Sequence, residues 1–175
     1  MTSWFMVTLI GKDQKGIVAR VTTILYENGY NLGESSMLRL GGNFTIMMMV
    51  SCDGEKQELG TLLQPIAEDL QLYLHVDAIE GHLHQHKIPD VHVCVYGADR
   101  AGIVAQVTQV LADAGLNILD LESDVGGSIH EPFYIMQIEG LASEGMDKLE
   151  QALHQLLTDQ PDLQVTLEPI ETVTM

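Results

Sequence analysis

The sequence predicts an α+β protein built from two copies of one small domain, each with the element order βαββαβ. Three observations support this prediction. One segment occurs twice, the same succession of strand and helix patterns follows each copy, and glycine turns separate the elements. Such a unit folds as a four-stranded antiparallel sheet with two helices on one face, because right-handed crossovers place both helices on the same side.

The repeated segment covers residues 7–31 and 93–117, at a constant offset of 86 residues and without a gap. Twelve of the 25 aligned positions are identical. They include an Asp, an Asn and several glycines, which a hydrophobic core alone does not require. The repeat therefore indicates a duplicated domain and a loop with a role in both copies.

The first copy shows six segments with strand or helix patterns. A β-rich run ends at Gly11, and apolar residues at helical spacing lie between a turn at 13–16 and the stop signal Asn28-Gly29. Two further β-rich runs flank the turn Gly41-Gly42-Asn43, as in a hairpin. We expect strands at 4–10, 31–40, 44–52 and 72–79, a helix of about three turns from residue 17, and a helix at 59–70.

The second copy follows the same plan with a longer hairpin turn. Aligning Phe44 with Phe133 needs an offset of 89, so the turn at 126–132 contains about three extra residues. Pro132 suits the first residue of a strand, because it has no N–H to donate to a neighbouring strand. The expected elements are strands at 91–96, 117–125, 133–139 and 163–168 and helices at 103–114 and 146–157.

We expect domains at residues 1–81 and 91–175, joined by a linker at 82–90. The run Met47-Met48-Met49 is apolar on both sides of its strand, which is typical of a central strand. Metal binding by these sulfurs is disfavoured, because neighbours on a strand point in opposite directions. Cys52 and Cys94 lie far apart in expected strands and are predicted to be buried reduced thiols.

The chain is strongly acidic, with 8 Lys and Arg against 25 Asp and Glu and a net charge of −17. Nucleic-acid binding relies on cationic side chains, so direct contact with DNA or RNA is not expected. Anionic membranes are disfavoured for the same reason. No apolar run reaches the roughly 20 residues that span a bilayer, and no secretion signal is visible, so a cytoplasmic protein is predicted.

The pattern Asp-x-x-Gly-Ile-Val begins at Asp13 and again at Asp99, each time between a strand and a helix. N–H groups in the first turn of a helix lack intrahelical partners and attract a carboxylate or phosphate. Asp would hold the ammonium group of an amino acid while these amides hold its carboxylate. The alternative is structural, since Asp commonly caps a helix and Gly admits a tight turn. The Asn that follows each helix is likewise either a turn residue or a partner for a zwitterion.

The repeated sequence D-x-x-G-I-V-A-x-V-T-x-x-L-x-x-x-G-x-N in a βαββαβ frame resembles the ACT domain, a ferredoxin-like regulatory module that commonly binds amino acids. Two such domains over nearly the whole chain are similar to the glycine cleavage system transcriptional repressor family. Family loops often read D-R-P-G, whereas Gln14 replaces the Arg in the first copy and Lys15 or Ala101 replaces the Pro. These departures point to a changed or lost ligand, most of all in the first loop.

The resemblance implies an effector site at the strand-to-helix loops and the neighbouring strand starts, at an interface between domains. It also implies a co-regulator that contacts a DNA-binding activator, with glycine as the family-guided ligand. Acidity favours a protein partner over DNA, and exposed sheet edges favour a homo-oligomer. The alternative is a stand-alone ACT module that controls an amino-acid metabolic enzyme. The implied ligand-binding residues are Asp13, Gly16, Ile17, Asn31, Asp99, Gly102, Ile103 and Asn117.

No catalytic or dinucleotide-binding fingerprint is present, so we expect no enzyme activity, catalytic residue or cofactor. His82, His84 and His86 alternate in the linker, and an extended segment would place all three on one side, as a Zn or Ni site requires. Exposed linker histidines usually coordinate nothing, so no metal site is predicted.

Overall fold

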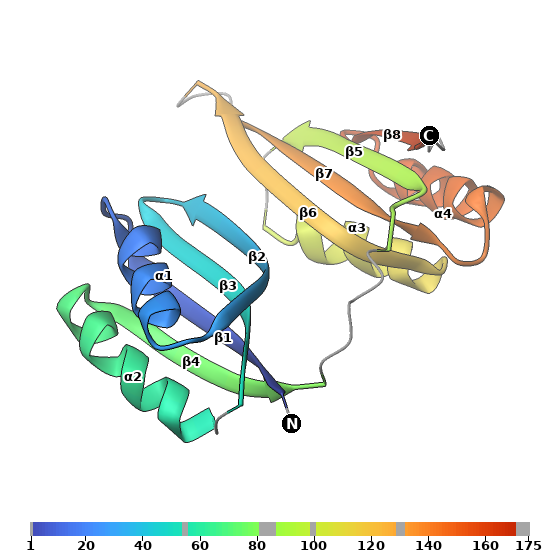
Figure 1. Cartoon of the computed structure of the whole chain (residues 1–175). Helices are drawn as coiled ribbons and strands as arrows, with labels where there is room; N and C mark the ends of the chain where they lie inside the picture. The colour runs from blue at the N-terminus through green and yellow to red at the C-terminus, as the bar shows by residue number, and fades with distance from the viewer. Residues whose placement is uncertain (1, 54–55, 81–86, 99–100, 129–131, 171–175) are drawn as a thin grey trace. The chain divides into compact units, whose positions relative to one another are not determined.

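The computed structural model describes residues 2–53, 56–80, 87–98, 101–128 and 132–170. The chain divides into two compact units, residues 1–84 and 85–175, and each unit holds one sheet and two helices (Figure 1). The domain bounds expected at 1–81 and 91–175 and the linker at 82–90 stay predictions, because part of that linker lies outside the described residues.

The first unit has the predicted order βαββαβ, and its sheet has the strand order β2-β3-β1-β4 with every neighbouring pair antiparallel. Both helices cover the same face of the sheet (Figure 1). Its elements are β1 (Ser3–Lys12), α1 (Ile17–Glu27), β2 (Asn31–Leu40), β3 (Asn43–Cys52), α2 (Lys56–Asp69) and β4 (Leu72–Ile79).

The second unit repeats this architecture with the strand order β6-β7-β5-β8, again antiparallel throughout. The predicted fold class, two α+β units of four strands and two helices, is therefore confirmed. Its elements are β5 (Val91–Ala98), α3 (Ile103–Asp113), β6 (Leu116–Gly127), β7 (Pro132–Ala142), α4 (Met146–Asp159) and β8 (Gln164–Pro169).

The alignment of the two hairpins differs from the prediction by one residue. Phe44 pairs with Gly11 in the first unit, and the corresponding Gly97 pairs with Tyr134 in the second. The third strands are thus related by an offset of 90 rather than 89, and the turn has four extra residues. Phe44 and Tyr134 are both buried against helices, whereas Phe133 lies on the opposite face, so matching Phe with Phe was wrong.

Each unit has one hydrophobic core, formed by alternate residues of the sheet and one stripe of each helix. The central position predicted for the methionine-rich strand is confirmed, since β3 lies between β2 and β1. Met48 belongs to the core, and Met49 is buried on the other face, where the Trp4 ring packs on Gly33. The second face is covered only in part, since Met47, on the same face as Met49, is 47% exposed.

Cys52 and Cys94 are free thiols, as predicted, but both are half-buried, so the prediction that they are buried was wrong. Cys52 is the last residue of β3, where the sheet ends. Cys94 lies between the buried residues Val93 and Val95, and it therefore faces the side of the sheet that carries no helix.

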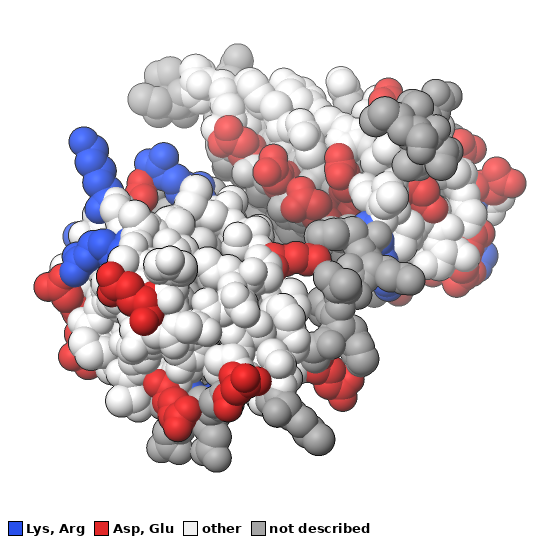
Figure 2. Space-filling model, in the orientation of Figure 1, with Lys and Arg blue, Asp and Glu red and all other residues white. Residues whose placement is uncertain are grey.

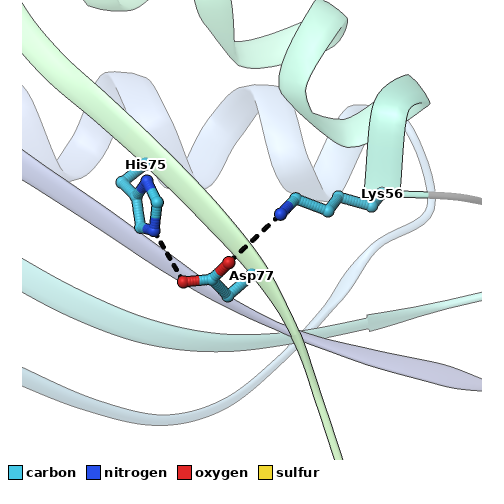
Figure 3. A network of polar contacts seen from close by, with 3 residues as sticks. All are labelled: Lys56, His75 and Asp77. Carbon is cyan, nitrogen blue, oxygen red and sulfur yellow. Dashed lines mark hydrogen bonds and ion pairs between the residues drawn. The ribbon is translucent and has the colours of Figure 1, made fainter.

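A polar network ties the start of α2 to the edge strand β4 (Figure 3). Lys56 Nζ lies 3.1 Å from Asp77 Oδ1, and His75 Nε2 lies 2.6 Å from Asp77 Oδ2. The hydrogen bond from Lys56, followed by that from His75, holds the pKa of the Asp77 carboxyl below its ordinary value. All three side chains are largely exposed, which marks this network as a surface tie between two elements.

Gly11→Ala is expected to destabilise the first unit. A Cβ at Gly11 would lie 2.7 Å from Leu72 Cδ2 and 2.9 Å from the carbonyl oxygen of Gln71. Overpacking of this kind costs about 1–3 kcal/mol in the free energy of unfolding, which urea denaturation measures. Gly60→Ala is the control, because no heavy atom lies within 4 Å of its Cβ and Ala favours a helix by up to about 1 kcal/mol. Equal stability of the two variants would contradict the packing argument.

Lys56→Gln is expected to raise the pKa of Asp77 toward its ordinary value, and to do so more than His75→Gln, because the Lys56 hydrogen bond is the larger cause of the depression. A carboxyl whose pKa is lower in the folded state stabilises that state above its unfolded pKa. This stabilisation is lost as the pH falls through the folded pKa. Carbon NMR of the Asp77 carboxyl during an acid titration measures the change, and an unaltered pKa in Lys56→Gln would refute it.

Candidate functional site

The loop between β1 and α1 is pinned to the turn of the neighbouring hairpin. The backbone N–H of Asp13 donates to the carbonyl oxygen of Gly42 at 3.1 Å. Gly16 then begins the helix with φ 87° and ψ 3°, a left-handed conformation that side chains with a Cβ disfavour. The backbone therefore requires glycine at this position, whether or not a ligand binds.

A hollow of about 540 Å³ opens at this loop. We call its lining the β1–α1 corner: residues 13–16, the first turn of α1 at 17–19, and three hairpin residues, Met37, Arg39 and Phe44. Among the described residues, no side chain caps the N-terminus of α1. The protein's own side chains thus leave space beside N–H groups that have no partner within the helix.

Asp13 forms an ion pair with Arg39 of β2 rather than a cap on α1. The Asp13 side chain is 25% exposed and the Arg39 side chain 67% exposed, so both reach solvent at the hollow. The structural alternative for Asp13, a helix cap, is therefore wrong. The corner presents a carboxylate and a guanidinium side by side.

Gln14 has a structural role in the same loop. Its Nε2 donates to the carbonyl oxygen of Leu70 at 2.6 Å, which fastens the loop to the residue after α2. The family pattern has Arg at this position. Gln14 therefore removes a positive charge from the loop and adds a hydrogen bond to the backbone of Leu70.

Ile17 and Ile103 belong to the two cores, with side chains only 2% exposed. Their side chains are therefore unavailable to a ligand. Any contact that these residues make in a site at the loop is made by their backbone N–H groups.

Asn31 lies outside the β1–α1 corner. It pairs with Ser51, whereas Arg39 pairs with Phe44 at the corner, and those two partners are about 23 Å apart along β3. Within the first unit taken by itself, Asn31 and Asp13 therefore cannot contact one small ligand.

The second unit shows the same helix start with different surroundings. Gly102 has φ 90°, and no side chain of the described residues caps α3. Asp99 lies outside the described residues. Asn117 is exposed and pairs with Leu141, near the end of β7 that is remote from its hairpin turn. Val125, which pairs with Tyr134, occupies the register position of Arg39 and is 51% exposed.

Positive charge gathers at the end of the first unit that holds the corner (Figure 2). Lys12, Lys15, Arg20 and Arg39 make up half of the Lys and Arg residues of the chain. Arg20 is engaged with Asp69 at 2.6 Å, and Asp13 is the acidic residue among those that line the hollow. Sequence reasoning missed Arg39, although an Arg beside the hairpin turn of so acidic a chain was the available signal.

Two more hollows open on the first unit, and neither contains a predicted site residue. One, of about 670 Å³, lies between α2 and β4 beside Lys56 and His75. The other, of about 480 Å³, lies on the helix-free face and is lined largely by apolar residues such as Ile10, Leu38 and Tyr73.

Among the residues that the structure describes, no group of three or more His, Cys, Asp or Glu is placed to hold a metal ion. His82, His84 and His86 lie outside that part of the chain. None of the described helices is long and apolar enough to cross a membrane.

Sequence comparison identifies an ACT domain at residues 3–77 and another at 93–158. A UPF0237 protein of Listeria innocua is 38% identical over 88 residues, which cover 47% of this chain and 97% of the relative. One from Methanosarcina acetivorans is 30% identical over 88 residues, covering 42% of this chain and 96% of the relative. Each relative therefore corresponds in length to about one unit of this chain.

Two solved structures match nearly the whole chain. An unknown protein from Galdieria sulphuraria has a TM-score of 0.76 and 25% identity, and the match covers 98% of this chain and 100% of that one. A protein provisionally described as a glycine cleavage system transcriptional repressor has a TM-score of 0.70 and 20% identity, with 98% and 99% covered. At 20% identity, the second match is evidence for the fold and not for a shared function.

Each matched segment falls within one βαββαβ unit, and the second match ends at residue 158, before β8. Each unit begins its first helix at a left-handed glycine after the repeated loop. The chain therefore belongs to the ACT domain family, as a regulatory protein with two ACT domains in tandem.

Proposed function

We propose that this protein is an amino-acid-responsive co-regulator of transcription that acts through a protein partner. The observation that carries the proposal is the β1–α1 corner, where Asp13, Arg39 and the uncapped N-terminus of α1 surround a hollow of about 540 Å³. A volume of that order suits a small molecule. Anionic and cationic groups side by side match the two charges of an amino acid.

The proposed roles follow from the chemistry of each group. Asp13 accepts hydrogen bonds from the ligand's ammonium group, while the N–H groups of Gly16 and Ile17 donate to its carboxylate. By the internal repeat, Asp99, Gly102 and Ile103 have the same roles in the second domain. Asn31 and Asn117 are proposed to contact the ligand of a second copy of the chain, because the strand register places each of them away from the hairpin turn of its own domain.

The β1–α1 corner is also connected to a surface that could bind a partner. Asp13 is joined to the β2–β3 hairpin through its backbone bond to Gly42 and through its ion pair with Arg39. β2 is an edge strand whose ten residues are all exposed, so it can pair with another chain. A ligand shifts such an association only as far as it binds the two states with different affinity. We propose homo-oligomer formation through this edge.

The partner is proposed to be a DNA-binding activator, and glycine the first ligand to test. A net charge of −17 opposes direct binding to DNA, so a promoter would be reached through another protein. The structural neighbour described as a glycine cleavage system transcriptional repressor shares the two-domain architecture, which supports this choice over other regulatory roles.

Asp13→Ala is expected to weaken amino-acid binding about tenfold or more, because a charged hydrogen-bond partner of the ammonium group is lost. Calorimetry of the full chain with each of the twenty standard amino acids measures the affinity. Asp77→Asn is the matched control, since it removes a carboxylate on β4 outside the corner. Equal binding by the parent and Asp13→Ala would remove Asp13 from the site, and no binding by the parent would refute the sensing role.

The immobilised chain is expected to retain a DNA-binding activator from a lysate of its source organism, to a degree that changes when the bound amino acid is added. Mass spectrometry identifies the retained protein, and reconstitution with the purified activator confirms direct contact. An amino-acid metabolic enzyme retained in the activator's place would support a stand-alone module that controls an enzyme. A promoter fragment bound by the chain alone would contradict the proposal.

A further inference from the structure

We infer that Arg39 is the residue by which the first ACT domain recognises the carboxylate of its ligand, and that this strand position, which Val125 occupies in the second ACT domain, does not serve the same purpose there. The inference rests on the proposed function and narrows the ligand class. It favours a molecule that carries a carboxylate next to its ammonium group, and a simple amine lacks the group that Arg39 contacts.

Arg39 reaches the hollow with hydrogen-bonding capacity to spare. Its Nη2 contacts Asp13, while the guanidinium group carries five N–H donors in a planar fork. The side chain is 67% exposed and lines the hollow together with the first turn of α1. Donors therefore remain for a second anion while the pair with Asp13 persists.

The spacing of charges in an α-amino acid fits this arrangement. One carbon atom separates the ammonium group from the carboxylate, so an ammonium on Asp13 brings the carboxylate next to the guanidinium that Asp13 already contacts. Arg binds carboxylates with two parallel hydrogen bonds, which a backbone N–H cannot do alone. Arg39 and the start of α1 would then hold the carboxylate from two sides.

Main-chain pairing fixes both charged residues at the corner. Arg39 lies opposite Phe44 in the β2–β3 register, and Phe44 is 3% exposed in the core. Met37 lies two residues earlier on the same face of β2 and also lines the hollow. The backbone of Asp13 is bonded to Gly42 in the same hairpin turn. The position of the pair is therefore set by the sheet and not by a mobile side chain alone.

The second domain departs from the first at this position. Val125 stands opposite Tyr134, as Arg39 stands opposite Phe44, and an aliphatic side chain cannot pair with a carboxylate. The two domains keep the same helix start with a left-handed glycine but differ on the strand that faces it. Recognition of a carboxylate through this strand is accordingly a property of the first domain.

The test compares Arg39→Gln, Arg39→Lys and the matched control Val125→Gln in the full chain. Each protein is titrated with glycine and methylamine, and with L-serine and ethanolamine, while NMR follows the backbone amides at 16–19 and 102–104. Arg39→Gln is expected to weaken the amino acid about tenfold or more and to leave the amine unweakened, because Asp13 loses its competing cation. Arg39→Lys restores part of the affinity, and Val125→Gln changes neither.

Thermal unfolding of the variants checks their folding, since an exposed ion pair contributes little to stability. Parent-like affinity of Arg39→Gln for the amino acid would overturn the inference and leave the proposed function standing. Equal weakening of amino acid and amine would overturn it too, because that result indicates a structural effect. Amide shifts confined to 102–104 would place the ligand in the second domain and also overturn it. If neither amino acid shifts any amide of the parent, the inference fails, and only the screen of all twenty decides the proposed function.

Discussion

The site depends on one constraint, the attachment of the β1–α1 loop to the turn of the β2–β3 hairpin. The backbone bond from Asp13 to Gly42 and the ion pair from Asp13 to Arg39 join segments that are about thirty residues apart in the chain. This attachment brings a carboxylate, a guanidinium and the start of α1 to one hollow. Because the hairpin strand β2 is also an exposed edge strand of the sheet, the corner is joined directly to a strand that is open to pairing with another chain.

Much of the fold was predictable because its signals are local. Hydrophobic periods, glycine turns and the internal repeat sufficed for all twelve elements and for the central place of β3. The repeated glycines have mostly structural causes that sequence reasoning treated as functional. Gly16 adopts a left-handed conformation, and a Cβ at Gly11 would collide with Leu72 and a carbonyl group. The Asp13 side chain has a structural contact as well, its ion pair with Arg39, and it also lines the hollow.

The offset between the third strands and the set of residues at the corner were not predictable, because both depend on the register between strands. The offset of 90 in the third strands follows from the pairing of Gly97 with Tyr134, and no local pattern distinguishes that partner from Phe133. Arg39 lines the hollow for the same reason, since the pairing of β2 with β3 brings it to Asp13. The register likewise places Asn31 away from the corner of its own domain, although motif similarity alone assigns Asn31 and Asp13 to one site.

The two domains therefore share a backbone fold and differ in the side chains at the corner. Positions that the backbone or the core requires are the same in both, such as the left-handed glycine and the isoleucine that begins each helix. Positions on the wall of the corner have diverged, with Arg39 against Val125 and Lys15 against Ala101. Duplication preserves what folding needs, whereas a surface that binds a ligand in one copy is free to change in the other. Under the proposed function, differences on the corner wall, more than the shared motif, would set the ligand preference of each copy.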